Sequence, residues 1–301
     1  MKATVEVIGA VEIQGKNWVA LVSDLVKARL TSLVLLTTLV GFYMGSQGTT
    51  QGWMMLHTLL ATALLAGGAA ALNQFLEREH DAKMRRTASR PIPSGQMKAD
   101  TALIIGGLMS AAGLVYLSLA VNLLTGALGA ATLASDLFIY TPLKRKTTLN
   151  TIIGAIPGAL PPLMGWTAAR GEITVEGWSL FAILFFWQLP HFLAISWIYR
   201  EEYGKAGFVM LSVRDPDGRR TAHQAVSHTL GLVALSLYPF LARLAGPVYL
   251  AGALLMGICF FWAAWQFSRK LTIPAARQLF LVSILYLPLL LGLLVWDKIK
   301  L

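Results

Sequence analysis

Long apolar stretches alternate with short polar stretches along almost the whole chain of 301 residues. Each apolar stretch is roughly 20 residues long, which is the length that a helix needs to cross the hydrocarbon core of a bilayer. None of them alternates strictly between apolar and polar positions, as the strands of a membrane barrel do. The pattern therefore predicts nine membrane-spanning helices, over residues 30–46, 53–76, 101–119, 123–142, 149–168, 178–199, 226–242, 247–267 and 276–296.

Composition supports this interpretation. Hydrophobic residues make up 56% of the chain and charged residues 13%, against about 25% charged residues in an ordinary soluble protein. A soluble globule of this size and a disordered chain are both excluded. We expect an all-α, polytopic membrane protein. A single domain of nine transmembrane helices fills residues 30–301, and residues 1–29 form an N-terminal cytoplasmic segment.

The basic residues are distributed unevenly between the two sides of the predicted bundle. Of the 25 Lys and Arg residues, 21 fall in the N-terminal segment and in the loops after the second, fourth, sixth and eighth spans. Because basic loops stay in the cytoplasm, we expect the N-terminus inside and the C-terminus outside. We expect neither a signal peptide nor a mitochondrial transit peptide at the start of the sequence, which favours a bacterial inner membrane. This asymmetry and anionic membrane lipid explain the net charge of +10 without a nucleic-acid partner.

Two of the predicted cytoplasmic connections, residues 77–100 and 200–225, are long and mix acids with bases. At the start of the first, Asn73, Glu77 and Asp81 recur every four residues, which places them on one face of a helix. Carboxylate and amide oxygens in this arrangement can hold Mg²⁺, which keeps further ligand positions for water and substrate phosphates. The alternative is a solvated helix end that carries ordinary charges.

Basic residues follow this stripe directly, at Lys83, Arg85, Arg86 and Arg90. Arginine forks suit phosphate oxygens, so acids followed by bases are what a metal-bridged diphosphate requires. A second basic cluster, Lys144 to Lys146, lies on the same predicted side and by itself indicates only topology. Asp136 lies about 12 Å into the preceding span, where it either pairs with a base or faces a wet cavity.

A histidine, His191, lies inside the sixth predicted span, and an ionisable residue within a membrane is a functional candidate. It is either a ligand or acid–base group, or a core histidine bonded to a helix carbonyl. The surrounding aromatic residues indicate either a pocket for a flat ligand or an aromatic belt at the membrane surface. They are Trp187, Phe192, Trp197 and Tyr203. Glu202, where the chain leaves the membrane, can complete a second metal site that faces the first.

The helix predicted over residues 149–168 contains Gly154, Gly158 and Gly165 together with three prolines. Glycines allow two backbones to approach each other closely. They serve either to shape a cavity or to pack two helices tightly.

Three stretches, in this order, resemble the signatures of the UbiA superfamily of intramembrane prenyltransferases, and within it of the branch that farnesylates haem. They are NQFLEREHDAKMRRTASRPIPSG, YTPLKRKTTLNTIIGAIPGALPPLMGW and WQLPHFLAISWIYREEYGKAGFVML. The segment KARLTSLVLLTTLVGF resembles the family's opening span. Together these stretches cover about a third of the chain.

The resemblance implies roles for individual positions. Asn73, Glu77 and Asp81 match the motif that holds Mg²⁺ and the prenyl diphosphate, and Glu202 matches an acid of the third signature. Basic residues that match diphosphate-binding positions are Arg86, Arg90, Lys144 and Arg145, beside Lys83 in the same cluster. His191 matches the histidine of a Pro-His-Phe signature and is expected to bind haem.

The resemblance further implies transfer of the farnesyl group of farnesyl diphosphate to a vinyl group of haem B, with addition of water, which gives haem O. Mg²⁺ is the implied cofactor, and a haem A synthase or a terminal oxidase is the implied recipient of the product. Two alternatives stay open. One is a relative that prenylates a quinone precursor or chlorophyllide, and the other is a transporter or channel with a polar site at the membrane midplane.

Overall fold

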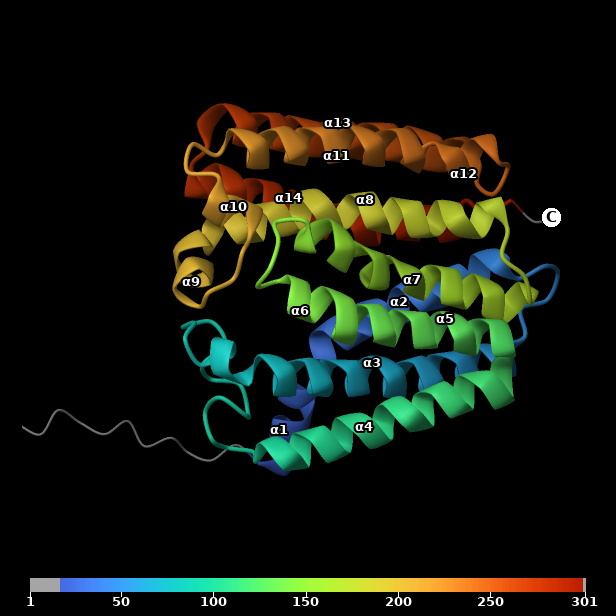
Figure 1. Cartoon of the computed structure of the whole chain (residues 1–301). Helices are drawn as coiled ribbons and strands as arrows, with labels where there is room; N and C mark the ends of the chain where they lie inside the picture. The colour runs from blue at the N-terminus through green and yellow to red at the C-terminus, as the bar shows by residue number, and fades with distance from the viewer. Residues whose placement is uncertain (1–16, 300–301) are drawn as a thin grey trace, which may run out of the picture.

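The computed structural model describes residues 17–299, and within this range the chain folds entirely into helices and their connections. Nine long helices run side by side, and the short helices lie between them at the ends (Figure 1). The long helices are α2 (Ala28–Gly45), α3 (Gly52–Asp81), α4 (Ala99–Tyr116), α5 (Leu123–Ala134), α7 (Asn150–Arg170), α8 (Val175–Ile198), α11 (Arg219–Ser236), α13 (Pro247–Lys270) and α14 (Ile273–Trp296).

The short elements are five further helices and two π-helical turns that extend α4 and α5. The helices are α1 (Trp18–Leu25), α6 (Thr141–Leu143), α9 (Arg200–Lys205), α10 (Leu211–Arg214) and α12 (Tyr238–Leu241), and the turns are η1 (Leu117–Val121) and η2 (Ser135–Tyr140). Helix α1 belongs to the N-terminal segment, of which residues 1–16 lie outside the described residues. Its Leu21 and Leu25 pack against Ala71 of α3.

The all-α membrane fold predicted from the sequence is confirmed. Eight of the long helices are apolar enough, over a sufficient length, to cross a membrane. The ninth, α11, corresponds to the span expected over residues 226–242, but it begins at Arg219 and ends at Ser236. Its first two turns carry Arg219, Arg220 and His223, which lower its mean hydropathy, although the helix lies along α13 in the same bundle (Figure 1).

Local sequence sets where several of these helices begin. Asn122, Thr174 and Thr272 each have extended backbone, and each side chain accepts a hydrogen bond from the backbone N–H three residues later. This bond satisfies one of the free donors of the first helical turn. Helix α7 ends at Gly171, whose φ of 75° suits glycine.

Glycine permits a close contact between α2 and α7. A Cβ atom on Gly165 would lie 1.9 Å from the carbonyl oxygen of Thr38, and one on Gly41 would lie 1.9 Å from that of Pro162. Another glycine of α7 has a different purpose. Gly154 makes room for the ring of Tyr140, and a Cβ on it would lie 2.3 Å from that ring. Gly165 therefore serves to pack two helices tightly, whereas Gly154 helps to shape a cavity, because Tyr140 lines one.

The first and last long helices are joined at the end of the bundle where the chain terminates. The ammonium of Lys298 donates to the carbonyl oxygens of Tyr43 at 2.6 Å and Ser46 at 2.8 Å. Both carbonyls lie at the C-terminal end of α2, where the regular bonding pattern of the helix stops. Lys298 therefore closes the bundle between α14 and α2.

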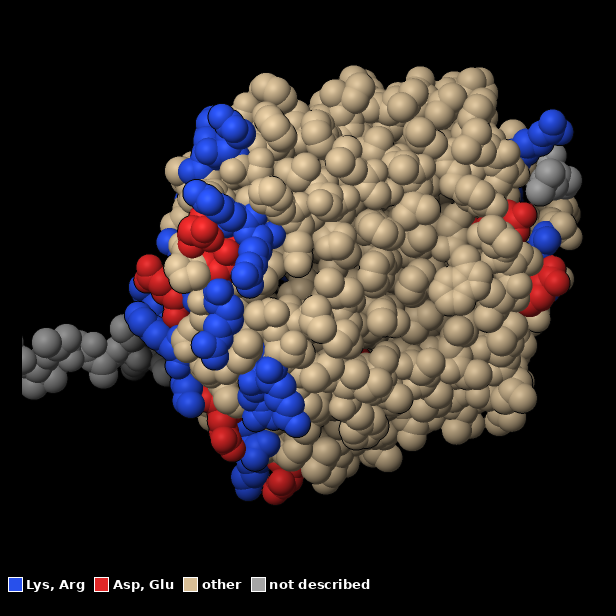
Figure 2. Space-filling view, turned by 45° about the horizontal axis from the view of Figure 1, so that its top comes forward, with Lys and Arg blue, Asp and Glu red and all other residues tan. Residues whose placement is uncertain are grey.

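Charged side chains gather at the two ends of the molecule and leave an uncharged belt between them (Figure 2). The end that carries α9, α10 and the connection after α3 has most of the Lys and Arg residues (Figures 1 and 2). The two long polar connections predicted from the sequence thus lie at the same end. We call it the charged end.

We expect Gly165→Ala to destabilise the bundle because the new methyl group has no room beside the Thr38 carbonyl. Overpacking of this kind costs about 1–3 kcal/mol. Gly292→Ala in α14 is the matched control, since nothing lies within 4 Å of its Cβ position. Thermal unfolding in detergent should give a lower Tm for Gly165→Ala only. Equal Tm values for the two variants would contradict the close α2–α7 contact.

Candidate functional site

The stripe of oxygens predicted from the sequence lies at the charged end of α3, and it is buried. Asn73 and Glu77 are each 6% exposed, and Asp81 is 1% exposed. Spacing by four residues places the three side chains on one helix face, and this face points into the bundle rather than to solvent. The alternative of an ordinary solvated helix end is therefore wrong.

Each side chain of the stripe accepts a hydrogen bond from a cation of a different segment. Asn73 accepts from Lys27 at 3.0 Å, Glu77 accepts from Lys144 at 3.0 Å, and Asp81 accepts from Arg90 at 2.5 Å. The three segments are the junction of α1 and α2, the connection after α6, and the connection after α3. A buried carboxylate without such a partner would be strongly unfavourable.

Lys27 was not among the residues predicted to form the site. It precedes α2 in the left-handed conformation, with φ 48° and ψ 54°, and a non-glycine residue in this region indicates local strain. Burial, together with the nearby charges of Arg90 and Lys144, lowers the pKa of Lys27 to about 8. A basic residue directly before an apolar span is the sequence signal for it, but the same signal marks topology.

The pKa of Lys144 is shifted in the opposite direction. Burial by itself lowers its pKa, but the phenol oxygen of Tyr140 and the carboxylate of Glu77 outweigh burial and hold the pKa above its ordinary value. Its ammonium also lies 4.4 Å from the centre of the Tyr140 ring. Lys144 is therefore a permanent positive charge, whereas the charge on Lys27 depends on pH.

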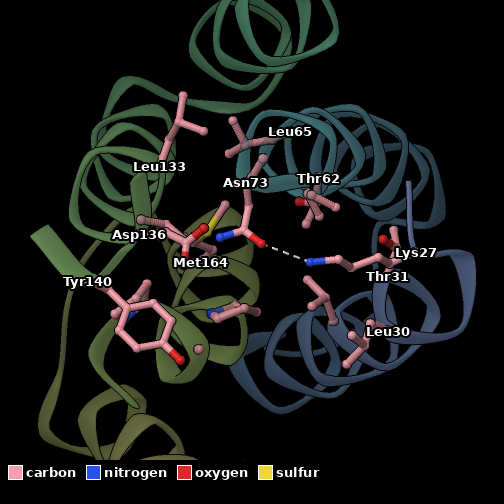
Figure 3. A pocket seen from close by; sticks show the side chains of 18 of the residues that line it. Lys27, Leu30, Thr31, Thr62, Leu65, Asn73, Leu133, Asp136, Tyr140 and Met164 are labelled. Carbon is pink, nitrogen blue, oxygen red and sulfur yellow. Dashed lines mark hydrogen bonds between the residues drawn. The ribbon is translucent and has the colours of Figure 1, made fainter. Parts of the chain in front are cut away.

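A mainly apolar cavity of about 320 Å³ extends from this cluster into the bundle between α2, α3, α5 and α7. Lys27, Asn73, Asp136 and Tyr140 surround its polar mouth (Figure 3). Its apolar part is lined by Leu30, Val34, Leu65, Ala66, Leu133 and Met164. We call it the first cavity. The sequence left two alternatives for Asp136, which were pairing with a base or facing a cavity. The structure supports the second.

A second cavity of about 260 Å³ adjoins the first and opens from the same cluster toward α8. The two share five lining residues, which are Lys27, Leu30, Asn73, Tyr140 and Lys144. All three stripe residues line the second cavity, together with Arg86 and Arg90. Its remaining wall is aromatic and apolar, and includes Phe192, Ile195, Tyr203 and Phe208.

His191 forms part of the wall of the second cavity. Its Nδ1 lies 2.7 Å from the hydroxyl oxygen of Ser283 in α14, so it is not the core histidine bonded to a helix carbonyl. Of the aromatic residues nearby, Phe192 and Tyr203 line the cavity as a flat-ligand pocket requires. Trp197 is instead buried against Phe267 in the core.

The segment after α9 contributes Phe208 and Met210 to the wall of the second cavity. Hydrogen bonds to three separate parts of the chain hold this segment. Nδ1 of His80 lies 2.8 Å from the carbonyl oxygen of Ala206, and the backbone N–H of Val209 donates to the Lys144 carbonyl at 2.7 Å. The side-chain amide of Asn150 donates to the carbonyl of Val209 at 2.7 Å. This segment is therefore joined directly to α3, which carries the stripe, and to Lys144, one of its cations.

The predicted site residues do not all meet. Glu202 lies at the rim, where its carboxylate is 3.5 Å from the backbone nitrogen of Arg86. Arg86 also donates to the hydroxyl of Tyr203 at 3.2 Å. Lys83 and Arg145 are exposed and line neither cavity, and Arg145 lies 3.2 Å from Nε2 of His80 instead. Tyr140 lines both cavities although it was not predicted to do so.

The donor set at the stripe fits Mg²⁺. Two carboxylates and one amide oxygen are hard ligands of the kind that Mg²⁺ prefers, and they leave positions for water and phosphate. The part of the chain that the structure describes contains no group of three His, Cys, Asp or Glu residues placed to hold a metal. Within the described residues, the stripe therefore does not form a complete metal site by itself.

The sequence matches the model of the UbiA prenyltransferase family over residues 34–290. It is 47% identical to a protein from Solibacter usitatus named protoheme IX farnesyltransferase, across 91% of this chain and 97% of that protein. A protein of the same name from Koribacter versatilis is 43% identical, across 92% of each chain.

Solved structures of distant relatives share the fold. A digeranylgeranylglyceryl phosphate synthase superposes with a TM-score of 0.79 at 17% identity, over 94% of this chain and 99% of the other. A UbiA homologue from Archaeoglobus fulgidus bound to GPP and Mg²⁺ gives a TM-score of 0.67 at 16% identity, over 91% and 99%. The family match and the close relatives together show that this chain belongs to the UbiA prenyltransferase family and, within it, to the protohaem IX farnesyltransferases.

Proposed function

We propose that this protein transfers the farnesyl group of farnesyl diphosphate to a vinyl group of haem B, with addition of water, to give haem O and diphosphate. One observation carries the proposal. Two cavities of different character, one mainly apolar and one aromatic with a histidine, meet at a cluster of cations and oxygens. Such a junction suits a diphosphate that lies between its own apolar chain and a flat acceptor. The close relatives bear the name of this activity.

The first cavity is the proposed site of the farnesyl chain. Along α3 it is lined from Asn73 at the mouth to Thr62 at the far end, which at 1.5 Å per residue is roughly 16 Å. The extended chain of three isoprene units has a similar length. Its diphosphate group would then lie at the mouth, beside Lys27 and Lys144.

The cations at the junction are the proposed diphosphate site. Lys27, Lys144, Arg86 and Arg90 line one or both cavities there, and arginine forks match phosphate oxygens. Asn73, Glu77 and Asp81 would hold Mg²⁺, and Glu202 would complete a second metal site from the rim. When bound, Mg²⁺ supplies positive charge that stabilises the departing diphosphate. Lys83 and Arg145, more distant, would attract the anion from solution.

In the proposed reaction, the bond between the allylic carbon of farnesyl and the diphosphate oxygen breaks, and its electron pair leaves with diphosphate. The cations stabilise this developing negative charge. The apolar first cavity keeps water away from the allylic cation. A vinyl carbon of haem forms the new carbon–carbon bond, water adds its oxygen to the other vinyl carbon, and the remaining proton leaves to solvent.

The second cavity is the proposed acceptor site. Phe192 and Phe208 offer flat apolar surface, and a neutral imidazole can ligate haem iron. We therefore assign His191 to haem binding, through the iron or a propionate, rather than to transfer of the reacting proton. This assignment distinguishes haem from a quinone precursor or chlorophyllide as the acceptor.

We further propose that the protein lies in a bacterial inner membrane with its N-terminus in the cytoplasm and its C-terminus outside. The charged end, which carries most of the basic residues (Figure 2), would then face the cytoplasm. Both substrates would enter from that leaflet. Haem O is more apolar than haem B, so a membrane enzyme such as a haem A synthase or a terminal oxidase is the proposed recipient.

The decisive test uses purified protein in detergent with haem B, farnesyl diphosphate and Mg²⁺, and reads pigments by chromatography and mass. We expect a haem that carries one farnesyl group and one added water. Prenylation of a quinone precursor without a haem product would leave the donor site intact and overturn the acceptor assignment. Solute flux without any transfer product would favour the transporter.

Glu77→Gln should lower the transfer rate roughly a hundredfold, because one charged group at the reacting centre is lost. Glu79→Gln is the matched control, since Glu79 lies half a turn away on the same helix with its side chain 79% exposed. Rates for both variants should be measured at saturating Mg²⁺ and over a range of Mg²⁺ concentrations. If Glu77→Gln behaved like Glu79→Gln, the stripe would not hold the metal.

The affinity for farnesyl diphosphate should depend on the charge of Lys27, whose pKa is about 8 in the free protein. A bound diphosphate raises that pKa, so binding above pH 8 requires uptake of a proton. The KM for farnesyl diphosphate should be constant below about pH 8 and rise up to about tenfold per pH unit above it.

Lys27→Arg should give a flat profile over the same range, because a guanidinium keeps its charge. Lys83→Arg is the control at an exposed lysine outside both cavities and should keep the wild-type profile. An unchanged profile in Lys27→Arg would show that another group titrates.

Met164 at the far end of the first cavity should limit the length of the prenyl chain. Met164→Ala should raise the ratio of kcat/KM for geranylgeranyl diphosphate over farnesyl diphosphate by about tenfold or more. Ile156→Ala is the control, since Ile156 lies on the same helix, 42% exposed and outside the cavity. The ratio within each variant cancels any loss of folded enzyme, and equal ratios would place the chain elsewhere.

A further inference from the structure

Ser283, on α14, makes two hydrogen bonds to α8 at the wall of the second cavity. Its hydroxyl oxygen lies 2.7 Å from Nδ1 of His191, and its carbonyl oxygen accepts from Nε1 of Trp187 at 2.7 Å. Ser283 is fully buried. A single residue of the last helix therefore contacts both the histidine and the indole that lies beside it.

The directions of these bonds determine the tautomer of His191. The hydroxyl of Ser283 also lies 2.6 Å from the carbonyl oxygen of Phe280 and donates to it. A serine hydroxyl has only one proton, and a carbonyl can only accept. The hydroxyl oxygen must therefore accept from His191, which places the imidazole proton on Nδ1. A neutral ring with its proton on Nδ1 has its lone pair on Nε2.

The imidazole ring also packs against two aromatic rings. Its centre lies 5.0 Å from that of Trp187, with an angle of 24° between the planes, and 5.0 Å from that of Phe280, with an angle of 33°. Trp187 is itself fixed by its bond to Ser283. Within the described residues, Nε2 has no hydrogen-bond partner, although His191 lines the second cavity.

We propose that Ser283 is a positioning residue that holds His191 in the Nδ1–H tautomer, so that Nε2 presents its lone pair to the iron of the acceptor haem. The inference deepens the proposed function, on which it rests, and selects the iron rather than a propionate. A histidine that binds a metal generally donates its other N–H to an acceptor, which fixes the ring and raises the basicity of the ligand. Here that acceptor would come from α14, 92 residues away.

The chain offers a matched control for loss of a buried serine hydroxyl. Ser236 of α11 is also fully buried, and its hydroxyl lies 2.8 Å from that of Tyr286. Ser236→Ala removes a hydrogen bond from the same group of helices but touches neither His191 nor the second cavity. If a general loss of packing were the cause, Ser236→Ala should weaken haem binding as much as Ser283→Ala does.

The test compares the binding of ferric haem B and of iron-free protoporphyrin IX to purified variants, followed by the Soret absorption band. Ser283→Ala should weaken haem binding roughly 10–100-fold and leave the affinity for protoporphyrin IX unchanged. Ser283→Thr, which keeps a hydroxyl, should restore haem affinity. His191→Ala should lose the absorption signature of an imidazole ligand, and Ser236→Ala should match the wild type with both ligands.

Two outcomes would overturn the inference in different ways. Equal haem affinity in Ser283→Ala and Ser236→Ala, with the signature lost only in His191→Ala, would make Ser283 irrelevant and leave the proposed function intact. An unchanged signature in His191→Ala would remove His191 from the haem site, and with it the role of Ser283.

A second measurement needs no variant at position 283. Nitrogen-15 NMR of histidine-labelled wild-type protein, with His191→Gln to assign the signal, reports which ring nitrogen carries the proton. We expect the proton on Nδ1. A proton on Nε2 would overturn the inference even if Ser283→Ala failed to fold.

Discussion

The structure depends on one electrostatic constraint, which is that the polar stripe of α3 lies buried and must be paired. A carboxylate removed from water is unfavourable by several kcal/mol unless a cation and hydrogen bonds compensate. The compensating cations come from three separate segments, at Lys27, Lys144 and Arg90. Their pairing with α3 fixes the entry to α2, the connection after α6 and the connection after α3 in one place.

The same constraint explains why the two cavities meet where they do. The close contact of α2 with α7, which Gly41 and Gly165 permit, brings the walls of the first cavity together. Gly154 allows Tyr140 to lie between that cavity and the second. Charge is therefore concentrated at the junction of two less polar spaces, where low polarity strengthens every electrostatic interaction.

The fold by itself does not specify the acceptor. The solved structures that share it are only 16–17% identical to this chain, and one of them is named for a product that contains no haem. The first cavity lies between α2, α3, α5 and α7, whereas His191 comes from α8 and contacts Ser283 of α14.

Local pattern alone was sufficient for the membrane class, for the helical segments and for the stripe at Asn73, Glu77 and Asp81, because apolar length and helical periodicity are properties of consecutive residues. It also predicted a functional role for His191, which lines the second cavity. Local pattern could not identify which cations belong to the site. Lys27 and Tyr140 belong to the site while Lys83 and Arg145 line neither cavity, although all four resemble ordinary residues at the ends of membrane spans.

Only the tertiary structure decided those partners, since the pairs join residues 46 and 67 positions apart, and Ser283 meets His191 across 92 positions. Contacts at such separations follow from how the helices pack. A helix face can be read from the spacing of its residues, but the neighbour it meets depends on the packing of every other helix in the bundle.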